Sequence, residues 1–244
     1  MKKYYYDLHV HSCLSPCGDD DNTPNNIAGM AKLCGLDIIA LTDHNSTKNC
    51  PAFFKACEKY GLLPIAGMEL TTSEDIHVVC LFERLQDARS FDEFIDEGRL
   101  KIKNKPDIFG HQYVLDDEDN PIGEVDELLI NASSLSISDV YETVVRFGGI
   151  CFPAHIDKLS NGIISILGTL PGDNDFNYFE LHDKTRVEEF SHLYGIPEDR
   201  FIISSDAHYL TDIKDADNFF VLEDNVNNEE LIAQLFELLR RSRK

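Results

Sequence analysis

The sequence predicts an α/β fold and, within that class, a barrel of strands surrounded by helices. Short apolar runs alternate with segments of helical periodicity along most of the chain, which is typical of repeated strand–helix units around a parallel sheet. Ionisable residues stand at or just beyond the ends of at least five of these runs. Because barrel enzymes carry their chemistry at the carboxyl ends of many strands, this placement favours a barrel over a doubly wound sheet.

The first third of the chain carries clear helix and strand signals. Thr23 and Pro24 predict a helix start, with Thr23 as the N-cap, and Gly35 ends that helix. A second helix covers residues 51–60 and ends at Gly61. Continuous apolar runs predict strands at residues 4–8, 36–41, 62–66 and 76–82.

The alternation is interrupted at residues 83–131, which we interpret as an insertion near the barrel mouth. It includes a helix around residues 91–95. Two short strands at 112–115 and 121–123 flank an acidic turn and predict a hairpin. Insertions at such a position shape specificity in many enzymes.

The remainder of the chain returns to alternating elements. Strands are predicted at residues 150–152, 178–181, 201–204 and 219–222, and helices at 138–147, 185–194 and 228–241. The sequence shows neither a low-complexity linker nor a second apolar core. We therefore expect a single barrel domain over residues 1–244.

Charge and apolar patterning limit the classes of partner. Acidic residues outnumber basic ones by 44 to 22, which gives a net charge of −22. Tight non-specific binding to duplex nucleic acid depends on lysines and arginines, so we expect a small substrate and no nucleic acid duplex. We find no signal-peptide core and no apolar run near the roughly 20 residues of a membrane span. We therefore expect a cytoplasmic protein without a membrane partner; its oligomeric state is left open.

Seven cysteines, without a Cys-x-x-Cys pair, suit a protein with reduced thiols. Cys34, Cys80 and Cys151 lie in apolar runs and are expected to be small buried residues. Cys13 and Cys17 flank a candidate metal-binding loop, but their spacing alone gives little reason to assign either as a ligand.

Two pairs of residues have a spacing that suits metal binding on a strand. Residues two apart on a strand point to the same face, so His9 and His11 can bind one ion together. Asp206 and His208 have the same spacing. Because charged residues are rare at apolar strand ends, two such pairs in one chain indicate a metal site.

Further candidate ligands follow other strands. Asp43 and His44 are adjacent, so we expect His44 to be a ligand and Asp43 to orient an imidazole. Glu69, His77 and His155 add more donors. Imidazoles and carboxylates bind Zn, Mn and Fe, and here they outnumber what one ion needs. The pattern predicts a multinuclear metallohydrolase.

These residues stand in six short motifs that together resemble the PHP family, named for polymerase and histidinol phosphatase. The motifs are Asp7-Leu8-His9-Val10-His11-Ser12, Leu41-Thr42-Asp43-His44-Asn45, Gly67-Met68-Glu69, Ile76-His77-Val78, Pro153-Ala154-His155 and Ser205-Asp206-Ala207-His208. The resemblance covers most of the chain outside the insertion. It implies a distorted seven-stranded (β/α) barrel of TIM-like form, with two or three divalent metal ions (Zn, Mn or Fe).

The resemblance also implies how the ligands divide among the ions of a trinuclear centre. One ion would be bound by His9, His11, Glu69 and Asp206. A second would share Glu69 and add His77 and His155. A third would be bound by Asp19, His44 and His208.

The position of Asp19 leaves alternatives open for this ligand. The loop after His11 is longer than is usual in the family and ends in three consecutive aspartates. Asp19 is chosen because Thr23 and Pro24 follow it at the family's spacing, while Asp20 and Asp21 remain alternatives.

The chemistry that the resemblance implies is hydrolysis of a small phosphorylated metabolite by metal-activated hydroxide. A nucleotide or a phosphate monoester such as histidinol phosphate would be the substrate. Glu69, Asp206 and His208 are the expected catalytic residues, and no general acid is identified. Lys158, Asn45 and His182 are candidate substrate contacts near the same rim.

Two other functions are considered. An amidohydrolase-type C–N hydrolase would use a similar barrel, but such enzymes often bridge their ions with a carboxylated lysine, whereas Glu69 stands at the bridging position here. A non-catalytic, metal-bound regulatory module would be expected to lack ligands, and this ligand set is nearly complete.

Overall fold

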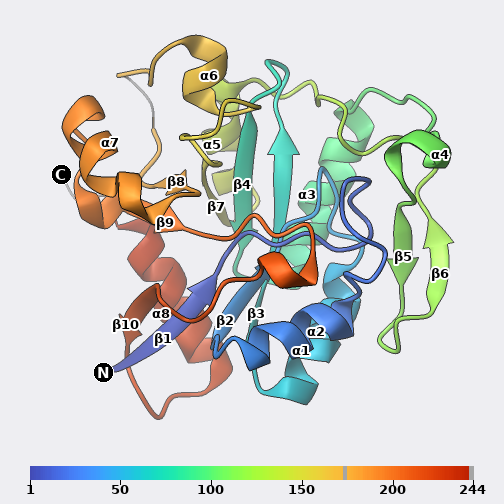
Figure 1. The fold of residues 1–244 in the computed structure, drawn as a ribbon, viewed down its shortest axis with the longest axis horizontal. Coiled ribbons are helices and arrows are strands. Elements are labelled where there is room, and N and C mark those ends of the chain that lie inside the picture. Colours follow the sequence, from blue (N-terminus) through green and yellow to red (C-terminus); the bar gives the residue numbers. More distant parts are fainter. Residues whose placement is uncertain (173–174, 242–244) are drawn as a thin grey trace.

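A curled mixed sheet forms the centre of the computed structural model, which describes residues 1–172 and 175–241 (Figure 1). The main sheet has the strand order β10-β1-β2-β3-β4-β7. Its strands are β1 (Lys2–Asp7), β2 (Ile38–Leu41), β3 (Leu63–Thr71), β4 (His77–Phe82), β7 (Gly149–Pro153) and β10 (Phe219–Leu222). A parallel pair, β8 (Phe179–Leu181) with β9 (Phe201–Ile203), continues the curl.

The ends of the curled sheet meet at the rim that carries the polar motifs. Val10, after β1, forms a parallel bridge with Ala207, after β9. The backbone N–H of His11 donates to the carbonyl of Ala207 at 2.9 Å. This contact brings the first and last motifs together in a distorted TIM-like barrel, as the sequence predicts.

Strand direction differs from the parallel sheet that we expected. The β1–β2 and β2–β3 pairs are parallel, but β4 runs antiparallel to both β3 and β7, and β10 runs antiparallel to β1. β4 is antiparallel to β3 because only a short turn connects the two strands, whereas parallel neighbours need a long crossover. As a result, His77 at the start of β4 pairs with Thr71 at the end of β3 and lies at the same rim.

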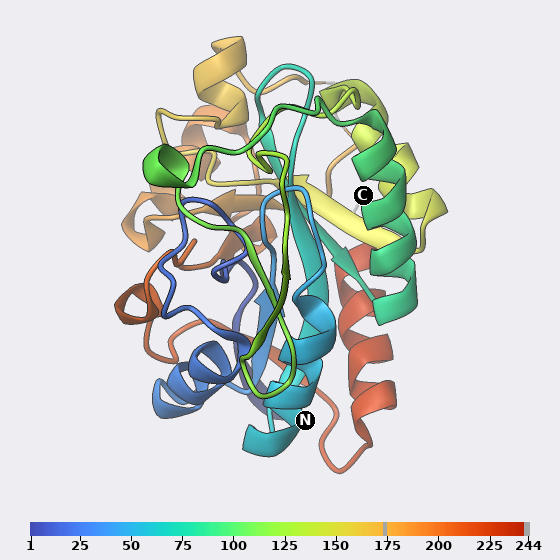
Figure 2. The ribbon, with the colours of Figure 1, turned by 90° about the vertical axis from the view of Figure 1, so that its right-hand side faces the viewer.

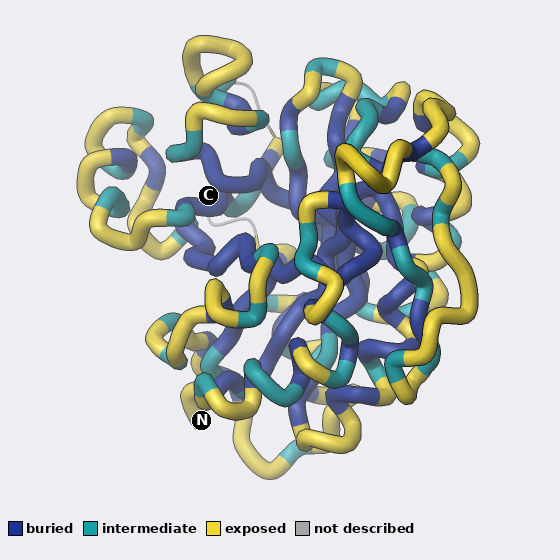
Figure 3. The backbone as a smooth tube through the Cα atoms, turned by 45° about the vertical axis from the view of Figure 1, so that its right-hand side comes forward, coloured by how far each residue is buried: buried dark blue, intermediate teal, exposed yellow. Residues whose placement is uncertain are grey.

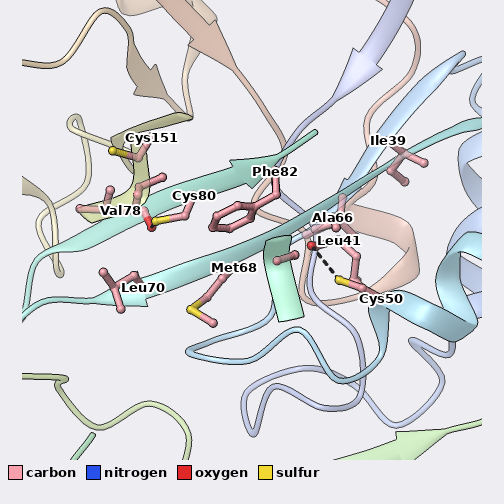
Figure 4. Packing of buried hydrophobic residues seen from close by; sticks show 14 of the residues in the cluster. Ile39, Leu41, Cys50, Ala66, Met68, Leu70, Val78, Cys80, Phe82 and Cys151 are labelled. Atoms are coloured by element: carbon pink, nitrogen blue, oxygen red, sulfur yellow. Dashed lines mark hydrogen bonds between the residues drawn. The ribbon is translucent and has the colours of Figure 1, made fainter. Parts of the chain in front are cut away.

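Apolar side chains pack on both faces of the sheet. Figure 4 shows part of the outer cluster, in which Met68 and Leu70 of β3 lie near Val78 and Cys80 of β4. The inner cluster contains Ile65 and is covered by residues of the last helix. Alternate residues of a strand share a face, so Glu69 is on the same face of β3 as Ile65.

Helices surround this sheet, most of them at the positions that the sequence predicts. Thr23 caps the first one, with its side chain accepting from the backbone N–H of Asn26. The α-helices are α1 (Pro24–Leu33), α2 (Cys50–Tyr60), α3 (Leu85–Gly98), α4 (Pro106–Phe109), α5 (Ile137–Arg146), α6 (Ile163–Leu167), α7 (Val187–Tyr194) and α8 (Asn228–Arg240). Short 3-10 turns are η1 (Lys184–Arg186), η2 (Glu198–Arg200) and η3 (Leu210–Asp212). Sequence patterns did not indicate the short α4 and α6.

Residues 83–131 lie beside the loops that follow β1 and β2. The predicted hairpin is present as β5 (Tyr113–Leu115) and β6 (Pro121–Glu124), and Figure 2 shows it beside α2. The backbone N–H of Tyr113 donates to Cys13 at 3.2 Å. Asn45 donates to the carbonyl of Leu129 at 2.6 Å. These contacts hold the segment near the rim.

The degree of burial differs between the loops at the rim and the outer surface of the molecule. Strands β2, β3 and β7 and the loop of residues 7–16 are almost entirely buried, whereas most of the β5–β6 hairpin is exposed. Figure 3 shows the buried backbone gathered in the middle of the molecule, with exposed segments around it. Among the described helices, none has the length and apolar character needed to cross a membrane.

Candidate metal centre

Three groups of potential metal ligands converge at the rim. In each group the ligand atoms lie within 4.8 Å of one another. The groups are His9, His11, Glu69 and Asp206; His44, Glu69 and His77; and His11, His44 and His208. Their side chains come from segments spread over the whole chain, so the barrel closure described above creates the site.

Glu69 lies at the centre of this cluster and is buried. Its Oε1 atom is 2.9 Å from Nδ1 of His77, 3.1 Å from Nε2 of His155 and 3.3 Å from Nε2 of His9. Its Oε2 atom is 3.0 Å from Nδ1 of His44 and 3.4 Å from Nε2 of His11. One carboxylate therefore contacts five imidazoles, with each oxygen facing a different subset.

The pKa of Glu69 shows how strongly these imidazoles act on it. Burial alone would raise the pKa of this carboxyl, but the charges of His77, His9 and His44 outweigh burial and hold it well below its ordinary value. Asp206 behaves in the same way, because His9 and His11 lower its pKa against the effect of burial. Both carboxylates are therefore anionic at neutral pH, as metal ligands must be.

Several buried atoms of the cluster make no hydrogen bond of good geometry with another described residue, although oppositely charged groups lie close to them. They are Oε2 of Glu69, Nδ1 of His44, Nδ1 of His77 and Oδ1 of Asp206. Buried polar atoms are rarely left without a partner, and each exception calls for an explanation such as an ion. Because imidazole nitrogens and carboxylate oxygens are ligands of Zn, Mn and Fe, this donor set fits divalent metal ions.

Glu180 fixes the orientation of His9. Its carboxylate oxygens lie 2.9 and 3.1 Å from Nδ1 of His9, and Nε2 of His9 faces the cluster. The same carboxylate accepts the backbone N–H of His155 at 2.9 Å. Sequence reasoning missed Glu180, although an acidic residue inside the short apolar strand β8 was a usable signal.

Asp43 orients His11 through a serine. Its carboxylate accepts from the hydroxyls of Ser12 and Ser15, each at 2.7 Å, and Oγ of Ser15 lies 3.0 Å from Nδ1 of His11. Because the Ser15 proton goes to Asp43, the serine oxygen accepts from Nδ1–H of His11, and Nε2 of His11 faces the cluster. The orienting role expected for Asp43 is consistent with this chain of contacts.

Two candidate ligands are held in an unusual backbone conformation. His155 has φ of 27° and Asp206 has φ of 53°, both in the left-handed region that residues other than glycine rarely adopt. Such strain is found mainly at functional sites, where the surrounding structure enforces it. Here it turns both side chains from their strand ends toward Glu69 and His9.

The structure does not place Asp19 with the other expected ligands. Its Oδ1 atom accepts the backbone N–H of Asp21 at 2.9 Å, and among the described residues Asp19 is in none of the three groups. Asp20 and Asp21, the alternatives, are exposed. The loop is tied to the rim by the backbone N–H of Asp19, which donates to the carbonyl of His208 at 2.9 Å.

Asn45, one of the expected substrate contacts, uses its amide group in internal hydrogen bonds. Its amide donates to the carbonyls of Leu129 and Asn131 at 2.6 and 3.1 Å, and its oxygen accepts from the backbone N–H of Thr71 at 2.9 Å. The residue is buried, and these internal bonds occupy its amide group. This arrangement favours a role for Asn45 in supporting the rim over the expected contact with substrate.

Lys158 and His182 lie at the edge of the cluster. The ammonium group of Lys158 is 2.6 Å from Oδ2 of Asp206 and is partly exposed. Burial, followed by the positive charges of Lys158 and Lys214, lowers the pKa of His182, so this imidazole is neutral at neutral pH. Lys214 also donates to the carbonyl of His182 at 2.9 Å. Lys158 and Lys214, close to the neutral His182, form a cationic edge in an otherwise acidic chain.

Comparisons with known proteins place the chain in a family and a fold. The PHP domain family matches residues 7–163, more than half of the chain. An uncharacterized protein of Methanocaldococcus jannaschii is 27% identical over 114 residues, which are 41% of this chain and 66% of that protein. The chain thus spans just under two thirds of this relative.

Solved structures share the fold at low sequence identity. Endonuclease Q from Pyrococcus furiosus superposes with a TM-score of 0.60 at 20% identity, covering 86% of this chain and 49% of the endonuclease. A protein of Bifidobacterium adolescentis, provisionally described as a metal-dependent phosphoesterase, has a TM-score of 0.57 at 16% identity and covers 96% of both chains.

One expectation about partners is wrong. We expected from the net charge of −22 that a nucleic acid duplex would not be a partner. Endonuclease Q, which shares this fold, has been solved with a 27-mer duplex that has an abasic lesion at the active site. Overall charge is therefore no ground for excluding a duplex, because it averages over the molecule whereas bound metal ions change the field locally.

The family match and the geometry of the cluster support the same conclusion. The His9-x-His11 pair, Glu69, His77 and the Asp206-x-His208 pair lie within the convergent groups described above. The chain belongs to the PHP family, and this membership together with the His/Glu/Asp cluster indicates a metal-dependent hydrolase.

Proposed function

We propose that this protein is a metal-dependent phosphoesterase. The observation that carries the proposal is the position of Glu69, whose two carboxylate oxygens face different sets of imidazoles. A carboxylate in this position can bridge two ions. Ions held in this way supply a water nucleophile near neutral pH and neutralise the phosphoryl oxygens as charge develops on them.

The chain's own residues hold the ligands in place for this reaction. Glu69 and Asp206 contribute negative charge, while Glu180 and Asp43 fix the imidazoles of His9 and His11 with Nε2 toward the centre. His9, His11 and Glu69 are almost completely buried, which excludes bulk water and strengthens their electrostatic effect on a bound phosphate.

The cationic edge is where a phosphate group would bind. Lys158 can turn from Asp206 to a substrate oxygen when metal ions take over the charge of that carboxylate. His182 is neutral at neutral pH and lies close to Lys158 and Lys214. A phosphate bound between Lys158 and His182 would lie next to Asp206 and His208.

The substrate that we propose first is a small phosphorylated molecule, a nucleotide or a phosphate monoester. Support comes from the depth of the cluster, since the proposed ligands other than His77 and His208 are buried. A compact phosphate group can reach such a site more easily than the backbone of an unbent duplex can.

A second candidate is phosphodiester cleavage in DNA. Its support is the fold shared with endonuclease Q, which acts with a lesion located at its active site. Because the alignment covers only 49% of the endonuclease, the parts of that enzyme outside the alignment have no counterpart in this comparison. The two candidates differ in the ester that is hydrolysed.

A substrate panel separates these functions. The metal-loaded protein is incubated with nucleoside monophosphates, histidinol phosphate, p-nitrophenyl phosphate, its bis ester, simple amides, and DNA duplexes with and without an abasic site. We expect phosphate release from a small ester, abolished in His9→Ala. Cleavage of lesion-bearing duplex alone would favour the endonuclease candidate, and turnover of amides alone would move the assignment to C–N hydrolysis. Full metal occupancy without turnover of any substrate would favour the alternative of a non-catalytic regulatory module.

A further inference from the structure

We propose that Asn49 is a positioning residue, which couples the inserted segment of residues 83–131 to the loops that carry His11 and His44. The proposal rests on the metal binding that the proposed function requires, but not on the identity of the substrate. Its basis is a continuous chain of hydrogen bonds that runs through buried side chains, from the β5–β6 hairpin to the imidazole of His11.

The side chain of Asn49 does not have the role that its place in the fold would suggest. Asn49 is the N-cap of α2, where an asparagine commonly accepts a backbone N–H of the first helical turn. Within the described part of the chain, its side chain makes no such bond. It donates instead to Oγ of Ser12 at 3.0 Å and to the carbonyl of Tyr113 at 3.1 Å, and its Oδ1 atom accepts the backbone N–H of Leu115 at 2.9 Å.

On one side, Asn49 holds the inserted segment. Tyr113 and Leu115 are the two ends of strand β5, so one amide group fixes both ends of this strand. Figure 2 shows the hairpin beside α2, the helix that Asn49 precedes. Large apolar side chains of the segment, such as those of Ile108 and Ile122, are exposed. Polar contacts therefore make a substantial contribution to the docking of the segment.

On the other side, Asn49 contacts the group that surrounds Asp43. The hydroxyl of Ser12, which accepts from Asn49, donates to Oδ2 of Asp43 at 2.7 Å. The backbone N–H of Ser12 donates to Oδ1 of the same carboxylate at 2.7 Å. Because an ionised carboxylate can only accept, the direction of both bonds is fixed. Asn49 therefore determines where Ser12, and through it Asp43, can lie.

Ser15 extends this network to two candidate metal ligands. Its hydroxyl donates to Oδ1 of Asp43 at 2.7 Å. Its oxygen accepts from Nδ1–H of His11 at 3.0 Å and from the backbone N–H of His44 at 3.1 Å. A displacement of Asp43 would therefore move the atom that orients the His11 ring and the backbone that carries His44.

Burial makes this network respond as a unit. Asn49, Ser12 and Ser15 are fully buried, and Asp43 is almost fully buried. A buried polar group without a partner is costly, so each member of such a network restricts the positions of the others. Groups that orient a ligand from outside the metal site commonly change metal affinity when they are altered. The loss of Asn49 should therefore weaken metal binding at the group formed by His9, His11, Glu69 and Asp206.

A double-mutant cycle tests the link between Asn49 and the metal centre. Zn²⁺ affinity of the metal-free full-length chain is measured by competition with a chromophoric chelator for wild type, Asn49→Ala, Ser12→Ala and the double variant. Ser12→Ala removes the link to Asp43 but leaves the bonds of Asn49 to the hairpin in place. Denaturant unfolding of each metal-free chain measures stability separately.

Two further variants complete the design. Gln112→Ala is the matched control, because Gln112 is another fully buried amide with three bonds to the backbone, all of them within the inserted segment. Asn49→Asp keeps the acceptor for Leu115 and loses the donor to Ser12, so it tests the same link if the alanine variant does not fold.

We expect Asn49→Ala, Asn49→Asp and Ser12→Ala each to lower Zn²⁺ affinity by about 10-fold. The double variant should also lose about 10-fold and not about 100-fold, because both substitutions break the same link. Gln112→Ala should reduce the free energy of unfolding and keep the wild-type affinity. A purely structural role for Asn49 would change stability alone.

Three results would overturn the proposal. They are unchanged affinity in a folded Asn49 variant, additive losses in the double variant, and a loss in Gln112→Ala as large as that in Asn49→Ala. Failure of the wild-type chain to bind Zn²⁺ overturns it together with the proposed function. The expected affinities without phosphoester turnover contradict the proposed function alone.

Discussion

The carboxylate of Glu180 lies 2.9 Å from Nδ1 of His9, and this contact determines which nitrogen of His9 faces the cluster. The two residues are 171 positions apart in sequence, on β8 and just after β1. Carboxylate–histidine pairs of this kind hold the ring orientation and raise the basicity of the ligating nitrogen. The pair therefore contributes to metal affinity without touching the metal.

Removing the charge of Glu180 tests that role. Glu180→Gln should lower the affinity of the first metal position by about 10- to 100-fold, because the amide holds His9 less firmly and no longer raises its basicity. Competition with a chromophoric chelator measures the change. The exposed Glu188→Gln on α7 is the control. Equal affinities in the two variants would show that the contact has no such role.

Asn45 should affect stability and not substrate binding. Asn45→Ala removes three internal hydrogen bonds and leaves the buried carbonyl of Leu129 and the buried N–H of Thr71 without this partner, so the free energy of unfolding should fall by about 2 kcal/mol. Denaturant unfolding measures this. Asn225→Ala is the control, because Asn225 is exposed and has a similar positive φ of 62°. A raised KM with unchanged stability would restore Asn45 as a substrate contact.

Lys158 should act on substrate binding and not on metal content. Lys158→Ala removes a charge-assisted contact to phosphate, which corresponds to a loss of about 10- to 100-fold in kcat/KM. Metal analysis should show unchanged occupancy. Lys184→Ala, which removes an exposed lysine paired with Asp217, is the matched control. If Lys158→Ala instead loses metal, the lysine serves mainly to support Asp206.

Metal affinity should rise with pH. In the metal-free protein, burial alone would lower the pKa of His9, His44 and His208, but Glu180 for His9 and Cys17 for the other two outweigh it and raise each pKa. These imidazoles hold protons that must leave before metal binds. Affinity should therefore keep increasing as the pH rises above about 6.5, the ordinary pKa of imidazole, with proton release. Calorimetry in buffers of different ionisation enthalpy detects those protons, and a pH-independent affinity contradicts the assignment.

Much of the fold could be predicted from the sequence because local patterns determine it. The Thr23 cap, the hairpin around residues 116–120 and the alternation of strands and helices depend on neighbouring residues. Strand direction at β4 depends on pairing across the sheet, which periodicity does not report. The short turn between Thr71 and His77 was the signal for an antiparallel pair.

The site could be predicted in part for the same reason. Every expected ligand except Asp19 lies at the rim, because each stands in a motif tied to a strand end. Glu180 was not selected, since its role arises from a contact with His9 that only the closed barrel creates. The internal partners of Asn45 lie in a distant segment, which local sequence patterns do not reveal.

The most direct test is phosphoester turnover while the metal-free chain is titrated with Mn²⁺ or Zn²⁺, beside Glu69→Gln. Glu69 is chosen because it contacts five imidazoles of the cluster. We expect no turnover without metal, an increase that saturates as the cluster fills, and little or none in Glu69→Gln. Turnover that does not depend on metal, or a fully loaded wild-type chain that hydrolyses no phosphoester, would contradict the proposed function.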